Sequence, residues 1–181
     1  MVVALCAGCS HGGHKASVQP NAPAAAPVDP VADMFQKMRT ANYQVDSSID
    51  DVEGALDATK KLAPKAGDQA GQALLNVADL LNTAGEKLSE FDDVPDSLDE
   101  FRKDFSSQDE HRLQGIETAI SALKAVRDAS DILDVLTQNV PADHKKELDD
   151  IVAKTGEAES DLEQAVGSMG GKVPPQDSGT Q

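Results

Sequence analysis

Between positions 31 and 63, apolar or small side chains recur at alternating steps of four and three residues. This spacing keeps one stripe of a helix facing its neighbours and is typical of coiled coils and helical bundles. Asp29 is a good N-cap, Pro30 suits the first helical position, and Pro64 ends the pattern. The sequence therefore predicts one long helix, with an inward seam made of Val31, Phe35, Met38, Asn42, Val45, Ile49, Val52, Leu56, Thr59 and Ala63.

Three further segments carry helical patterns. One spans residues 66–91 with small residues along its seam, one spans 98–140, and one opens at Pro141 and runs to position 169. The Asp- and Pro-containing stretch 92–96 predicts a turn. Ser107 and Glu110 have capping-box spacing, so a break near Ser107 is expected inside the third segment.

Four helices joined by short, proline-containing turns predict an all-α fold, an elongated up-down-up-down four-helix bundle over residues 30–169. Gly167 or Gly170 is the expected stop, and residues 170–181 are expected to form a disordered tail. Asn42 is a polar seam residue of the kind that fixes helix register. Because many seam residues are Ala, Thr or Asn, a second arrangement stays open, in which two long hairpins bury their seams by forming a homodimer.

The chain is strongly acidic, with 32 Asp and Glu residues against 16 Lys and Arg residues and a formal net charge of −16. Such a surface repels nucleic-acid phosphates and gains nothing from anionic lipid headgroups. Aromatic residues make up only 3% of the chain, so the flat faces that sugar and quaternary-ammonium sites need are scarce. The composition therefore disfavours nucleic acid as a partner.

The N-terminus carries the run Leu5-Cys6-Ala7-Gly8-Cys9, which closes a short apolar stretch. Two small residues directly before a cysteine resemble the lipobox of bacterial lipoproteins, although Cys6 stands where Leu is usual. The resemblance implies that Leu5, Ala7 and Gly8 serve signal recognition and that cleavage falls before Cys9. It further implies lipidation of Cys9 by a diacylglyceryl thioether and by a fatty acid such as palmitate on its new amino group.

The same resemblance implies where the protein works. Residues 1–8 are then a signal-peptide-like segment, and residues 9–29 are the lipidated Cys with an Ala- and Pro-rich linker. The protein is expected outside the cytoplasm, and Ser10 after the cysteine suggests the outer membrane facing the periplasm in a diderm host. No Lys or Arg precedes the motif, and one explanation is a true start upstream of Met1. At about 3.1 Å per residue, the linker reaches up to about 60 Å.

The two cysteines also belong to a possible metal pattern. Cys6, Cys9, His11 and His14 form C-x-x-C-x-H-x-x-H, and these residue types suit zinc. Structural zinc sites usually join ligand pairs from separated segments, whereas these four ligands lie within nine positions in a glycine-containing stretch. Metal binding is therefore the weaker interpretation of this cluster.

A cofactor-binding bundle is a second alternative. The Val-Pro-Asp-Ser segment at 94–97, together with Met34 or Met38, resembles parts of the periplasmic b-type four-helix cytochromes, which pair such a Met with a His near the end of the last helix. That His is absent here, and His111 in the third segment is the only substitute. No nucleophile elbow or phosphate-binding glycine loop is present. We expect no enzymatic activity, no catalytic residues, no metal and no cofactor.

These observations favour a membrane-tethered, extracytoplasmic helical bundle that binds a protein partner or serves a structural role in the cell envelope. The alternative from a different class is an amphipathic carrier of lipid or another hydrophobic ligand. Its helices would open at Gly85, Gly115 and Gly156, each of which weakens a helix interior by about 1 kcal/mol relative to Ala. The acidic polar faces weigh against it, because interfacial helices are usually rich in Lys and Arg.

Overall fold

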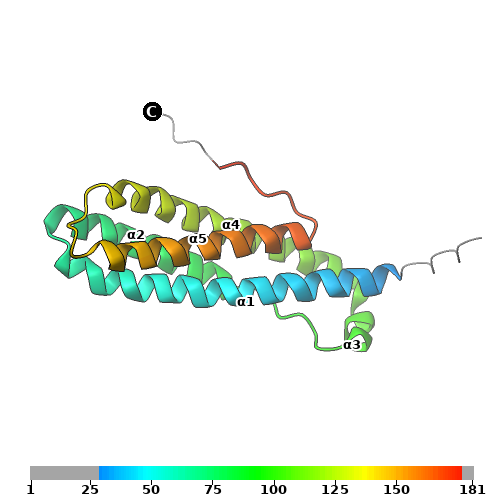
Figure 1. Ribbon diagram of the computed structural model, residues 1–181. Helices are drawn as coiled ribbons and strands as arrows, with labels where there is room; N and C mark the ends of the chain where they lie inside the picture. The colour runs from blue at the N-terminus through cyan, green and yellow to red at the C-terminus, as the bar shows by residue number, and fades with distance from the viewer. Residues whose placement is uncertain (1–28, 177–181) are drawn as a thin grey trace, which may run out of the picture.

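The computed structural model describes residues 29–176, and the predicted signal and lipidation residues Leu5, Ala7, Gly8 and Cys9 lie outside this range. Every regular element within the range is helical, which confirms the all-α prediction (Figure 1). In chain order these elements are α1 (Pro30–Leu62), the 3-10 turn η1 (Ala63–Lys65), α2 (Asp68–Leu88), α3 (Leu98–Lys103), α4 (Phe105–Thr137) and α5 (Lys145–Ser168).

The four long helices lie side by side and give the molecule an elongated shape (Figure 1). α1 packs along α2 and α5, and α4 packs along the same two helices, whereas α1 and α4 touch only slightly. Each long helix therefore buries a stripe between two neighbours, as helical bundles do. The large side chains at the centre are fully buried and include Leu74, Leu81, Leu123, Ile151 and Leu162.

Local signals set the ends of α1 as the sequence predicts. The Asp29 carboxylate accepts hydrogen bonds from the backbone N–H groups of Val31 at 3.0 Å and Ala32 at 3.4 Å, and Pro30 is the first helical residue. Pro64 lies in η1, directly after the helix ends. Residues within one turn of each end are therefore sufficient to fix these two boundaries.

The two ends of α5 differ in how well the sequence predicts them. The helix begins at Lys145 rather than at Pro141, which lies in the preceding turn. At the other end Gly170 adopts a φ of 80°, and the N–H of Gly171 donates to the Val166 carbonyl at 2.8 Å. A glycine in the left-handed region closes a helix in this way, so Gly170 is the predicted stop.

The third predicted helix is in fact two helices, so the described residues form five α-helices rather than four. The chain leaves helical geometry at Asp104, with φ −111° and ψ 25°, between Lys103 at the end of α3 and Phe105 at the start of α4. Ser107, the predicted cap, lies inside α4. The break lets α3 turn off the α4 axis and bury Phe101 against α1.

Three of the ten predicted α1 seam positions are shifted by one residue. Six of the predicted seam residues are buried: Phe35, Met38, Val45, Val52, Thr59 and Ala63. The residues that complete the observed seam are small and fully buried: Ala41, Ser48 and Ala55. The residues predicted in their place are only partly buried: Asn42, Ile49 and Leu56. Small side chains let the neighbouring helices come close, and the larger ones then pack at the flank of the contact.

Asn42 does not act as a buried register residue. It is partly buried, its side-chain amide donates to Asp46 at 3.2 Å, and its oxygen accepts the backbone N–H of Val94 at 3.4 Å. Asn42 therefore fastens the connection between α2 and α3 to the side of α1.

The three helical glycines predicted as soft points differ from one another. A Cβ on Gly115 would lie 3.1 Å from the Met169 sulfur and 3.1 Å from the Phe91 ring. A Cβ on Gly85 would make only an ordinary contact, and one on Gly156 would meet open space. Gly115 thus serves close packing, whereas the position of Gly156 places no steric demand for glycine.

Candidate functional site

Asp29, the first residue that the structure describes, is held in place at the start of α1. The Asp29 carboxylate, which caps α1, also pairs with the Arg102 guanidinium of α3. The hydrogen bond from Arg102 lowers the pKa of the Asp29 carboxyl, which favours its charged form. We call the end of the molecule that holds Asp29 and α3 the α3 end (Figure 1).

Aromatic and sulfur-containing side chains fill the α3 end. Phe35, Met38 and Phe101 form a small core separate from the main one, and the Phe35 and Phe101 ring centroids lie 5.4 Å apart. Met38 thus belongs to a cluster with two aromatic rings, a setting that thioethers favour. Met34 packs at the edge of this cluster, and His111, the other ligand considered for a haem, is exposed on α4.

An open groove of about 730 Å³ lies at the opposite end of the molecule, between the start of α2 and the end of α4. We call this the groove end. The groove lining is mainly small and apolar, and it consists of Ala66, Gly67, Asp68, Gln69, Ala70, Ala73, Asp131, Ile132, Val135, Leu136, Asn139 and Pro141.

The path of α2 explains why this groove is open. A Cβ on Gly71 would lie only 2.6 Å from the Ala63 carbonyl oxygen, so α2 begins in close contact with the end of α1. On the side that faces α4, Ala70 and Ala73 are too short to fill the space, and the Val135 side chain remains 62% exposed. An apolar surface left open in this manner is a common feature of binding grooves.

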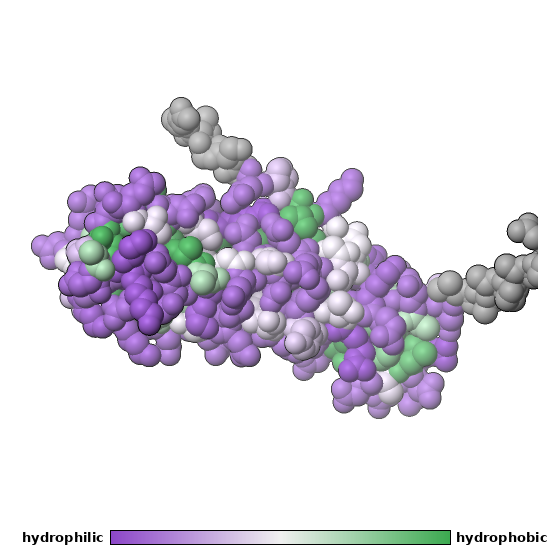
Figure 2. Space-filling view, in the orientation of Figure 1, coloured by the Kyte–Doolittle hydropathy of each residue, from purple (hydrophilic) through white to green (hydrophobic). Residues whose placement is uncertain are grey.

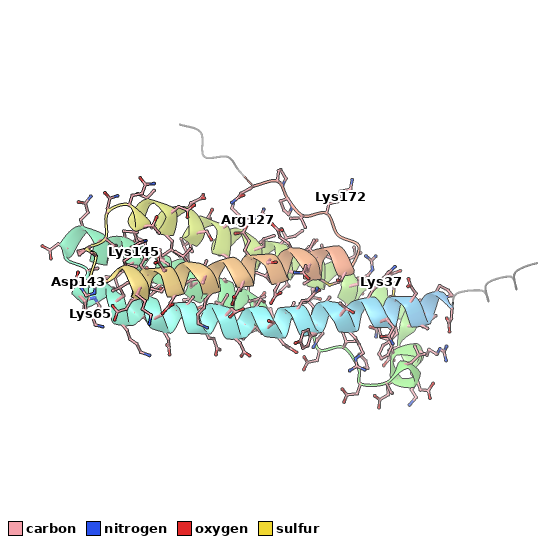
Figure 3. All side chains as sticks on the ribbon, viewed as in Figure 1. Lys37, Lys65, Arg127, Asp143, Lys145 and Lys172 are labelled. Atoms are coloured by element: carbon pink, nitrogen blue, oxygen red, sulfur yellow. The ribbon has the colours of Figure 1, made fainter. Side chains whose placement is uncertain are left out.

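The charge around the groove has one sign. Asp68 on α2 and Asp131 on α4 line it, and no Lys or Arg does. Lys65 and Lys145 lie at the same end of the molecule (Figure 3). Their ammonium groups already lie 3.2 Å and 3.1 Å from carboxylates of α5. The groove therefore combines apolar walls with negative charge at its rim.

A partly buried ion-pair cluster lies midway along the molecule. The Arg127 side chain is 12% exposed; its Nε lies 2.9 Å from Glu159, and Nη2 bonds to Glu163. Its Nη1 donates to the Pro174 carbonyl at 2.8 Å, so part of the predicted tail runs along α4 (Figure 3). Burial lowers the pKa of Arg127, but the hydrogen bonds to both glutamates outweigh it and raise the pKa above its usual value.

A second charged cluster lies where α1 meets α5. Asp51 is partly buried there, 3.8 Å from the Lys154 ammonium, with Glu157 and Asp161 nearby. Burial, followed by the negative charge of Glu157, raises the pKa of Asp51. Within residues 29–176, no group of three or more His, Cys, Asp or Glu side chains is placed to hold a metal ion.

Sequence reasoning placed the candidate site at the N-terminus and missed the groove. The signal that could have found it is the row of small residues at the start of the second seam, opposite larger apolar residues near the end of the third segment. Within residues 29–176, none of the helices combines the length and the hydropathy needed to cross a bilayer. Comparison with protein-family models, with curated proteins and with solved structures gives no match.

Proposed function

We propose that this protein is a lipid-anchored helical module on the extracytoplasmic side of a bacterial envelope, where it binds another protein or spaces envelope components. The observation that carries the proposal is the Leu5–Cys9 run, followed by an Ala- and Pro-rich linker that leads into the helices. In this proposal Cys9 carries the lipid, and Leu5, Ala7 and Gly8 belong to the signal that directs its attachment.

The position at which the linker joins the bundle supports a tether. The linker meets α1 at the α3 end, and the 33 residues of α1 span about 50 Å at 1.5 Å per residue. The groove lies beyond the other end of α1, so an anchor at Cys9 would leave it on the side away from the membrane. A surface in that position is accessible to a second protein.

We further propose that the four long helices form an up-down-up-down bundle in a monomer, with α3 as an added short helix. The contact pattern, in which α1 and α4 are diagonal to each other, supports this arrangement. One chain buries its own seams, so it does not need a partner hairpin to cover them. Light scattering on the unlipidated full chain tests this, with a mass of 19.0 kDa expected and twice that mass contradicting it.

The anchor is tested by expressing the full chain in a bacterium that processes lipoproteins and labelling it with an alkyne fatty acid. We expect label on the protein and a mass spectrum in which the mature chain begins at a diacylated or triacylated Cys9. Cys9→Ser should abolish the label completely.

Cys6→Ser is the matched control, because Cys6 lies in the same run but should leave with the signal segment. It should leave the label unchanged. Label that survives Cys9→Ser, or a mature chain that still begins at Met1 without lipid, would contradict the proposal.

The groove favours a second candidate function, the binding of a hydrophobic small molecule. Its volume lies in the range of ligand pockets, and its walls are mainly apolar. The test is titration of a fluorescent fatty acid into the unlipidated full chain. Saturable binding that Ala73→Phe removes would favour this candidate over a protein-binding role.

A further inference from the structure

We propose that the groove end binds a cationic amphipathic helix of a partner protein. The helix would lay its apolar face between α2 and α4 and direct basic side chains toward Asp68 and Asp131. This inference rests on the proposed function, because it specifies the kind of partner that the module would bind.

The shape of the groove fits this mode of recognition. Its volume of about 730 Å³ exceeds that of a single large side chain, and its two walls come from two helices. An amphipathic helix in a groove presents a row of apolar anchors at positions i, i+3, i+4 and i+7. Ala70 and Ala73 leave room for such anchors, while Ile132 and the exposed Val135 offer apolar contact on the opposite wall.

The negative charge of the groove favours a partner with positive charge. Asp68 and Asp131 stand on opposite walls, and within residues 29–176 neither lies in an ion pair. Lys65 and Lys145 at this end are held by carboxylates of α5, no Lys or Arg lines the groove, and the whole chain carries a net charge of −16. Basic residues flanking an apolar helix face would therefore be attracted from a distance and paired on binding.

The same charge argues against the other occupants of the groove. A second copy also carries a net charge of −16, so its surface would repel the acidic groove. The last residues of this chain, Asp-Ser-Gly-Thr-Gln at 177–181, contain no apolar anchor. A fatty acid has a carboxylate that Asp68 and Asp131 would repel.

The experiment uses the full chain carrying Cys9→Ser, so that no lipid is needed. The probe is a fluorescein-labelled peptide of Leu and Lys in amphipathic order, about five helical turns long, followed by anisotropy in about 0.15 M salt. We expect saturable binding of this peptide and none of its counterpart with Glu in place of Lys.

Two matched pairs of variants separate the groove from general charge attraction. Val135→Asp should weaken binding at least about tenfold, although it adds a negative charge. Leu113→Asp makes the same change at a residue of α4 that is 54% exposed and outside the groove, and it should not weaken binding. Asp68→Asn with Asp131→Asn should weaken binding several-fold, whereas Asp57→Asn with Asp79→Asn, which removes equal charge elsewhere, should have little effect.

The inference is overturned if the two members of either pair behave alike, if the Glu peptide binds equally well, or if a fluorescent fatty acid binds with no dependence on Asp68 and Asp131. These results are independent of the anchor. Loss of fatty-acid labelling with intact peptide binding would reject only the tether, and the reverse pattern would reject only the helix-binding groove. Circular dichroism of each variant confirms that the helices are retained.

Discussion

The two ends of the bundle are made from the same kind of helix, but one end is filled by side chains and the other is open. At the α3 end, large side chains fill the space between α1 and a short added helix: Phe35, Met38 and Phe101. At the groove end, small side chains leave the space between α2 and α4 open: Ala66, Ala70 and Ala73. Figure 2 shows apolar patches beside α3, at the opposite end and midway along the molecule, on a face that is otherwise hydrophilic or neutral.

This contrast shows how side-chain volume decides whether the end of a bundle is closed. A helix break at Asp104 adds α3 and supplies Phe101 as a plug at one end. The other end has a short turn, η1, and no added element within the described residues. The filled end holds Asp29 at the start of α1, and the unfilled end leaves apolar surface open.

The largest effect is expected at the filled end. Phe101 is fully buried, so Phe101→Ala should lower the free energy of unfolding by about 3 kcal/mol through lost burial and an added cavity. Phe105→Ala is the control, because that ring is 39% exposed and its loss should lower the stability by less than about 1 kcal/mol. Urea unfolding measures both, and equal losses would show that α3 does not form a true core.

A smaller loss is expected where α2 crosses the end of α1. Gly71→Ala would place a methyl group 2.6 Å from the Ala63 carbonyl oxygen, and relief of that contact should lower the free energy of unfolding by about 2 kcal/mol. Gly156→Ala is the matched change in open helix and should raise it by up to about 1 kcal/mol. If both alanines stabilise the protein on thermal or urea unfolding, the close contact at the groove end does not exist.

A larger side chain in the groove and a larger side chain in the core should change the free energy of unfolding in opposite directions. Ala73→Leu adds apolar area against Ile132 and Val135 and should raise the free energy of unfolding by about 0.5–1 kcal/mol. Ala84→Leu makes the same change at a fully buried position and should lower it by about 1–3 kcal/mol, because no space is available there. Similar losses for both variants in urea would mean that the groove is already filled.

The smallest effect is expected between the two ends, at Asp51. Because burial and Glu157 raise its folded-state pKa above the usual value of 3.8 for an Asp carboxyl, the folded protein binds this proton more tightly than the unfolded chain does. Ionisation of Asp51 therefore lowers the stability as the pH rises from 3.8 through the folded-state pKa, and the loss is fully present at neutral pH. Asp51→Asn should raise stability at pH 7 by less than about 1 kcal/mol, and the gain should disappear below about pH 3.8.

Thermal unfolding at pH 7 and near pH 3.5 measures this difference. Asp57→Asn, an exposed change on the same helix, is the control and should alter the melting temperature little at either pH. A loss of stability in Asp51→Asn at pH 7 would show that the Lys154 ammonium compensates the buried charge.

Particular residues show which parts of the fold the sequence could predict. Asp29, Pro30, Pro64 and Gly170 mark helix ends because capping and proline geometry depend only on neighbours within one turn. The choice between Ala41 and Asn42, and likewise between Ser48 and Ile49, was predicted wrongly. Periodicity cannot distinguish adjacent seam positions when the distance to the neighbouring helix decides which side chain fits.

Neither the groove nor the Arg127 cluster could be predicted from the sequence. Both depend on residues that lie far apart in the chain: Arg127 meets Glu159 and Pro174, and α2 meets the end of α4. The spacing of charges along one helix gives no information about contacts between residues that lie far apart in the chain. The N-terminal run, in contrast, is a purely local signal, and its test lies in the chemistry of Cys9.

The sequence by itself determined that the chain between positions 30 and 169 is mainly helical, where α1 begins and ends, and the acidic character of the surface, because each follows from short-range geometry or simple composition. Tertiary structure alone decided that the break between α3 and α4 falls at Asp104 rather than near Ser107, which seam residues are buried, and that one end stays open. Those outcomes depend on how closely helices approach one another, and this distance is set by all the packed side chains together rather than by any one segment.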